Sequence, residues 1–160
     1  MNHLFAALPT YNGQRLNTLA VVDLHATLQE QVTLFECSCS LLARNFNIAW
    51  TQALNERMTK GITHFLLLHA DVSPRGSGWI TTLLHKMERT KAKVLSVVLP
   101  LKSAEGVVST ALDDPDYPTS SLVSQFTTTE IHQMPEETFT HERLLANTGC
   151  LLVDFREPWV

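Results

Sequence analysis

The stretch that decides the fold of this chain is Thr63-His64-Phe65-Leu66-Leu67-Leu68-His69-Ala70-Asp71. Its apolar residues, 65–68, are followed by a loop that contains Pro and Gly at 73–78. A short apolar run between turn residues is typical of a strand that is covered on both faces, as in a parallel α/β sheet. Ligands of open α/β sheets bind just beyond the carboxyl ends of the strands, where we expect Asp71. Its carboxylate there suits either of two roles, holding a divalent cation or simply capping the turn.

The length and composition favour one globular domain over residues 1–160. The chain is 44% apolar and 18% charged, and a domain of this length can bury a full core. No apolar run approaches the roughly 20 residues of a bilayer-spanning helix, and Met1-Asn2-His3 lacks the basic start of a signal peptide. The net charge of −4 gives no electrostatic footprint for nucleic acid, although it does not exclude a local basic patch. We expect a cytoplasmic protein with no membrane partner.

The cysteines and histidines do not form a recognised zinc or disulfide pattern. Cys37, Cys39 and Cys150 do not make a disulfide framework. Cys37-Ser38-Cys39 is too tight for the usual zinc spacing, and strand alternation would place both thiols on one face. Free cysteines are among the most buried residue types, so we expect buried, reduced thiols. The seven histidines include no His-x-x-x-His pair, which leaves a zinc hydrolase unsupported.

The order of expected elements predicts an α/β fold. We expect strands at residues 4–8, 32–37, 65–68, 93–99, 106–112, 121–127 and 144–155, and helices at 14–29, 40–60 and 79–89. Ser40 is the expected N-cap of the second helix and Gly61 its stop, and residues 113–120 are an expected loop. Alternation of strands and helices over the first hundred residues predicts right-handed βαβ units. The central sheet should then be mostly parallel and flanked by helices.

Six short motifs occur in an order that is familiar from one enzyme family. They are Pro9-Thr10-Tyr11-Asn12, Ala43-Arg44-Asn45, His69-Ala70-Asp71, Val98-Leu99-Pro100-Leu101-Lys102, Asn147-Thr148-Gly149-Cys150 and Glu157-Pro158-Trp159. Together, and in their expected strand contexts, they resemble the glycosyltransferases of the GT-A fold, particularly the compact bacterial and phage-type enzymes. The resemblance spans nearly the whole chain and implies a Rossmann-like nucleotide-binding half.

The resemblance implies a site for a nucleotide sugar. Its residues would be Pro9, Thr10, Tyr11, Asn12, Arg44, Asn45, His69, Ala70, Asp71 and Lys102. The loop at residues 9–12 would cradle the base and ribose, and Asp71 with His69 would bind Mn²⁺ or Mg²⁺. Such a cation neutralises the charge that develops on a diphosphate leaving group. Structural interpretations stay open beside these roles: the loop at 9–12 suits a plain turn, Arg44 a solvated helix position and Lys102 a surface position.

The chain departs from the family pattern in two respects. His69 stands where the family's Asp-x-Asp motif has its first acid. Imidazole can ligate Mn²⁺ but suits Mg²⁺ poorly, so either Asp71 binds the metal alone or His69 contacts the sugar or phosphate directly. Family members also continue past the Pro-Trp element into a segment that supplies a catalytic acidic residue and often a metal-binding histidine. No catalytic residue is assigned here for that reason, and the sequence is interpreted as C-terminally incomplete.

The expected function is therefore that of a metal-dependent glycosyltransferase or of its nucleotide-sugar-binding portion. The donor would be a nucleoside-diphosphate sugar and the acceptor a DNA base, a protein or a glycan. The alternative is a catalytically silent binding or assembly module, and either form can be a homo-oligomer. We expect the chain to bind a nucleoside diphosphate but to transfer sugar poorly. If it turns over efficiently, the base is to be sought among Asp113, Asp114, Asp116, Glu136 and Glu137.

Overall fold

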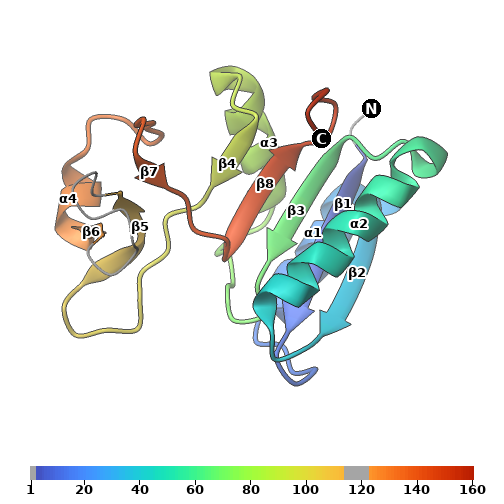
Figure 1. The fold of residues 1–160 in the computed structure, drawn as a ribbon, viewed down its shortest axis with the longest axis horizontal. Coiled ribbons are helices and arrows are strands. Elements are labelled where there is room, and N and C mark those ends of the chain that lie inside the picture. Colours follow the sequence, from blue (N-terminus) through green and yellow to red (C-terminus); the bar gives the residue numbers. More distant parts are fainter. Residues whose placement is uncertain (1–2, 114–122) are drawn as a thin grey trace. The chain divides into compact units, whose positions relative to one another are not determined.

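The computed structural model describes residues 3–113 and 123–160 (Figure 1). The chain forms two compact units, one from Met1–Leu95 together with Thr148–Val160 and the other from Ser96–Asn147. The single domain expected over residues 1–160 remains a prediction beside this division. Within the described ranges, no helix combines the length and the apolar character that crossing a membrane requires.

The first unit is built on a five-stranded sheet with the strand order β2-β1-β3-β8-β4. Its strands are β1 (Leu4–Thr10), β2 (Val32–Ser38), β3 (His64–Leu68), β4 (Val94–Ser96) and β8 (Cys150–Asp154). β3 lies at the centre, and every residue of β1, β3 and β8 is buried. The predicted strand at 65–68 is thus confirmed, whereas the strand expected at 93–99 is limited to β4.

The expectation of a mostly parallel, Rossmann-like GT-A sheet is wrong. β1 pairs in parallel with β2 and β3, but β8 runs antiparallel to β3, with Leu66 opposite Leu152. The second sheet, described below, is antiparallel in both of its pairs. An apolar run such as 65–68 reports burial on both faces of a strand, and burial is the same whichever way the neighbouring strand runs. The direction of β8 was therefore not readable from the apolar run.

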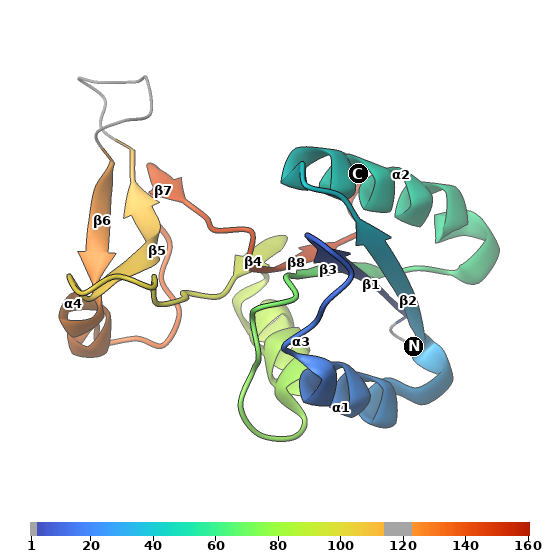
Figure 2. The same cartoon turned by 90° about the horizontal axis from the view of Figure 1, so that it is seen from below.

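Three helices cover the first sheet. They are α1 (Thr18–Leu28), which leads into a 3-10 turn at Gln29–Gln31, α2 (Leu42–Lys60) and α3 (Trp79–Thr90). Figure 2 shows α2 on one face of the sheet and α1 with α3 on the other. Gly61 ends α2 with φ of 67°, as predicted, because a left-handed C-cap favours glycine. The Ser40 cap is wrong: the N-cap is Leu41.

Aromatic side chains fill the core between α2 and the sheet. Phe65 stacks on Phe155 with ring centroids 5.4 Å apart, and Trp50 of α2 meets both rings edge-on at 5.0 and 4.8 Å. Phe5 and Phe46 extend the cluster. Edge-to-face and offset pairs add to the stabilisation that burial of their area already gives. This cluster packs α2 against β1, β3 and Phe155, which directly follows β8.

The second unit holds an antiparallel sheet of order β6-β5-β7 and the short helix α4 (Thr128–Gln133). Its strands are β5 (Val107–Leu112), β6 (Ser124–Thr127) and β7 (Leu144–Leu145). Thr127 and Glu130 form a capping box that starts α4. The single strand expected at 144–155 is wrong, because β7 and β8 belong to different sheets. Most of the loop expected at 113–120, and the start of the strand expected at 121–127, lie outside the described residues.

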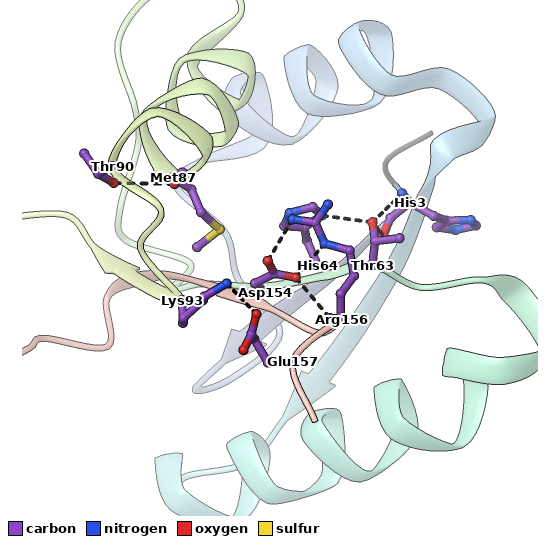
Figure 3. A network of polar contacts seen from close by, with 9 residues as sticks. All are labelled: His3, Thr63, His64, Met87, Thr90, Lys93, Asp154, Arg156 and Glu157. Atoms are coloured by element: carbon purple, nitrogen blue, oxygen red, sulfur yellow. Dashed lines mark hydrogen bonds and ion pairs between the residues drawn. The ribbon is translucent and has the colours of Figure 1, made fainter. Parts of the chain in front are cut away.

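A polar network lies at the edge of the first sheet where β1 and β3 begin (Figure 3). The hydroxyl of Thr63 accepts the backbone N–H of His3 at 2.9 Å and lies 2.9 Å from Nδ1 of His64. Arg156 donates from Nε and Nη2 to the two carboxylate oxygens of Asp154, at 2.8 and 2.7 Å. These hydrogen bonds hold the pKa of Asp154 well below its ordinary value, at about 2. Burial lowers the pKa of His64, and the nearby Arg156 adds to this effect.

We predict that Asp154→Asn lowers the free energy of unfolding at pH 7 by up to about 2 kcal/mol. The figure follows from the difference between the ordinary and the folded-state pKa of Asp154, because one pKa unit corresponds to 1.36 kcal/mol. Because the folded-state pKa lies below the unfolded one, this contribution is full above about pH 4 and is lost as the pH falls toward 2. Urea unfolding of both proteins between pH 3 and 7 measures it. Equal stability at pH 7, or a gap that does not shrink toward pH 3, would contradict the prediction.

Candidate functional site

A cavity of about 390 Å³ opens in the first unit beyond the carboxyl ends of β1 and β3. Three segments that are far apart in the sequence form it: the loop after β1, the connection from β2 into α2, and the turn after β3. Eight of the ten predicted site residues line it, namely Pro9, Thr10, Tyr11, Asn12, Asn45, His69, Ala70 and Asp71. The other lining residues, which sequence reasoning missed, are Gln14, Leu16, Cys39, Ser40 and Leu42.

Two predicted residues are not part of this lining. Arg44 is exposed on the first turn of α2, next to the buried Asn45. Lys102 is exposed and belongs to the unit Ser96–Asn147. Neither appears among the residues that line the cavity in the described part of the chain. Their roles in binding remain predictions.

Local hydrogen bonds shape the loop after β1. The hydroxyl of Thr10 accepts the N–H of Gly13 at 3.1 Å, and Oδ1 of Asn12 accepts the N–H of Gln14 at 3.1 Å. Gly13 has φ of 80°, a conformation that glycine adopts without strain. Tyr11 projects from this turn with 76% of its surface exposed. The loop is thus a self-supported turn, which matches the structural interpretation, and it also presents an aromatic ring at the cavity.

Asn45 joins the two loops on one side of the cavity. It is 2% exposed, and its Nδ2 donates to the carbonyls of Thr10 at 3.4 Å and Cys39 at 3.1 Å. Its Oδ1 is buried and accepts no hydrogen bond from the described residues. A buried amide that bonds two loops fixes their spacing, because leaving such groups unpaired is costly. Asn45 therefore positions the two loops beside the cavity.

Asn17 joins the loop before α1 to the turn after β3, and the sequence analysis did not identify this residue. It is 1% exposed, and its Nδ2 donates to the carbonyls of His69 at 2.9 Å and Val72 at 3.1 Å, 52 and 55 residues further along the chain. The N–H of Leu16 also donates to the carbonyl of Ala70 at 2.9 Å. The loop before α1 thereby holds the turn that carries Asp71. The only signal in the sequence was an Asn before a helical stretch, which suggests a cap rather than a long-range link.

His69 and Asp71 differ in their access to the cavity. His69 is half-buried, its Nε2 is buried and unpartnered within the described residues, and burial lowers its pKa. The nearby Asp71 opposes this shift only in part. The imidazole is thus neutral at pH 7, and Nε2 is not the atom that meets a ligand. Asp71 is exposed at the cavity.

Of the two predicted metal ligands, Asp71 and His69, only Asp71 fits a metal site. Across residues 3–113 and 123–160, no three His, Cys, Asp or Glu side chains gather as a metal-binding group. Mg²⁺ and similar hard cations are often held by one or two carboxylates, with substrate phosphates and water filling the other positions. Asp71 fits that arrangement as the carboxylate. The buried Nε2 of His69 does not fit as a ligand atom.

Comparisons with known proteins give the fold and no family. No protein-family model matches the chain, and no curated protein matches it. The chain is similar to the solved crystal structure of A197 from STIV, with a TM-score of 0.55 and 15% sequence identity. The match covers 98% of this chain and 66% of that one, so this chain spans just under two thirds of its length. At this identity the likeness concerns the fold alone.

We predict that Asn17→Asp loosens the turn after β3. The substitution keeps the shape but removes the donor and sets a carboxylate against two carbonyl oxygens, and each buried group left unpaired costs about 1–3 kcal/mol. Hydrogen exchange should show at least tenfold faster exchange at the amide of Val72, which donates to His69 at 3.0 Å. Asn55→Asp, on the exposed side of α2, is the matched control and should leave that amide unchanged. Unchanged protection in Asn17→Asp would rule out the link.

Proposed function

We propose that this protein binds a nucleoside-diphosphate sugar in the cavity beyond β1 and β3, with Mn²⁺ or Mg²⁺ at Asp71, and acts as a glycosyltransferase or as its nucleotide-sugar-binding portion. The observation that carries the proposal is convergence. Residues 9–12, Asn45 and residues 69–71 were selected from sequence motifs, and they line one cavity.

The cavity has properties that suit such a ligand. Its volume of about 390 Å³ falls in the range of about 300–1,000 Å³ that is usual for small-molecule sites. Tyr11 offers an exposed ring face, and Leu16 and Leu42 add apolar wall beside it. Aromatic and apolar walls with a few polar groups are what a base and ribose need.

The polar side of the cavity supplies the remaining chemistry. Asp71 would hold the cation, which when bound supplies positive charge to the diphosphate leaving group. Asn17 would keep Asp71 in place through the carbonyls of His69 and Val72. The acceptor hydroxyl would attack the anomeric carbon of the sugar; the motifs do not choose among a DNA base, a protein and a glycan as the acceptor.

A second candidate is a binding module without catalysis. It is favoured by His69, which stands where the resembled family has an acid and whose Nε2 is buried. With Asp71 as the one carboxylate among the described residues that line the cavity, a nucleotide can be bound more readily than its leaving group can be activated. The two candidates differ in turnover and agree on binding.

We predict that Asp71→Asn abolishes metal-dependent nucleotide binding and leaves the fold intact, because an exposed residue beyond a strand contributes little to packing. Thermal unfolding is measured with a panel of nucleoside diphosphates and their sugars, with and without Mn²⁺. A ligand at about 100 times its dissociation constant adds roughly 2.7 kcal/mol to the wild type. The control variant Glu105→Gln, an exposed carboxylate of the other unit, should keep the full effect.

Two outcomes would count against this proposal. If the whole panel leaves the wild type unchanged, the cavity does not take these ligands. If Asp71→Asn unfolds the protein and the wild type shows no metal dependence, Asp71 is only the cap of its turn.

Release or transfer of sugar separates the enzyme from the binding module. We predict that the wild type, saturated with the stabilising nucleotide sugar, binds it in calorimetry and transfers or hydrolyses it slowly. A positioned general base contributes about 10²–10⁴-fold in rate, and no such residue is assigned at the cavity. A product assay on the calorimetry sample, with Asp71→Asn as the control, makes the measurement. Turnover that disappears in Asp71→Asn supports the enzyme, and binding without any turnover supports the module.

A further inference from the structure

Two of the three cysteines lie on one face at the end of β2. Cys37 is in the strand, Cys39 follows it, and both are half-buried. Glu36, which precedes Cys37, and Ser38, which lies between the two cysteines, are exposed. The N–H of Cys39 donates to the carbonyl of Thr10 at 3.2 Å, which continues the pairing of β2 with β1 past the end of the strand. Extended backbone places residues i and i+2 on the same side. The two thiols are therefore neighbours.

Both sulfur atoms face the start of α2. The thiol of Cys37 donates to the carbonyl of Asn45 at 3.7 Å, and Sγ of Cys39 accepts the N–H of Leu41 at 3.4 Å. Leu41 and Asn45 are themselves joined, since the N–H of Asn45 donates to the carbonyl of Leu41 at 3.1 Å. One helical turn thus fixes both thiols. Burial raises the pKa of Cys37, and the neighbouring Cys39 raises it further.

This spacing suits a bridging atom better than a direct disulfide. Two residues of a strand advance by about 6.6 Å, near the upper limit of about 6.8 Å between the Cα atoms of a disulfide, and the side chains run side by side. An atom bonded to both sulfurs at about 2.3 Å each spans them without drawing the backbone together.

We propose that Cys37 and Cys39 form a two-thiolate site for a soft, low-coordinate metal ion such as Cu⁺. Thiolates select soft ions, and Cu⁺ is stable with two of them. Zn²⁺ prefers four ligands, and the described residues supply no group of three. On binding, both S–H groups lose their protons, two Cu–S bonds form, two protons are released, and copper stays in the +1 state.

The site reaches the cavity through Cys39, which lines it beside Ser40. An ion held by the two thiolates would occupy part of the cavity wall, and it would draw Cys39 away from the N–H of Leu41. The metal site itself rests on the thiol geometry and stands whether or not the cavity binds a nucleotide.

Transfer of Cu⁺ from a chromogenic chelator tests the site under anaerobic conditions, with the full chain and no other ligand. We expect one Cu⁺ per chain, and at least tenfold weaker binding in Cys37→Ser and in Cys39→Ser. Cys150→Ser is the matched control and should bind as the wild type does, because Cys150 is buried in β8 and Cys37 and Cys39 lie at the end of β2.

Thiol labelling gives a second readout that needs no variant. Alkylation followed by mass spectrometry of the wild type should show that Cu⁺ protects Cys37 and Cys39 together, and that Zn²⁺ at the same concentration does not. The proposal is overturned if the wild type takes no copper from the chelator. It is also overturned if either single variant binds like the wild type, or if copper protects neither or only one of the two thiols.

Discussion

The central constraint on the first unit is the complete burial of β3. Each residue from His64 to Leu68 is enclosed, with β1 paired on one side and β8 on the other. A strand in this position must satisfy its backbone groups through its neighbours, since water does not reach them. Phe65 also anchors the aromatic cluster beneath α2. The turn that carries Asp71 starts where this strand ends, so the rigidity of β3 sets one wall of the cavity.

Buried amides then bring the loops together. Asn17 ties the loop before α1 to the turn after β3, and Asn45 ties the end of β1 to the segment before α2. Each side chain donates to two backbone carbonyls that belong to different segments or to the two ends of a turn. Because such bonds form in a buried setting, they specify loop positions more sharply than apolar contacts do. The shape of the cavity therefore depends on Asn17 and Asn45 as well as on the sheet.

The same region holds two kinds of chemistry, which meet at Cys39, a residue that lines the cavity. Asp71 and the exposed ring of Tyr11 suit a phosphate-bearing ligand, whereas Cys37 and Cys39 suit a soft cation. Hard and soft ligands discriminate strongly between metal ions, so a hard cation at Asp71 and a soft one at the thiols would not compete for the same donors. The backbone hydrogen bond from the N–H of Cys39 to the carbonyl of Thr10 connects the two parts of this region.

Local pattern was enough to identify the early strands, the three long helices and the stop at Gly61, because apolar runs, helical periodicity and turn residues are properties of neighbouring positions. The predicted cavity residues, apart from Asp71, came from the resemblance of short motifs to a known family. Local pattern could not predict the direction of β8, residues 150–154, because the sequence pattern of a buried strand is the same in either orientation. Local pattern also did not predict the role of Asn17 or the burial of Nε2 of His69. Nor did it predict the division of residues 144–155 between two sheets. Each of these is a contact between residues far apart in the chain, and such contacts are settled only when the whole unit packs.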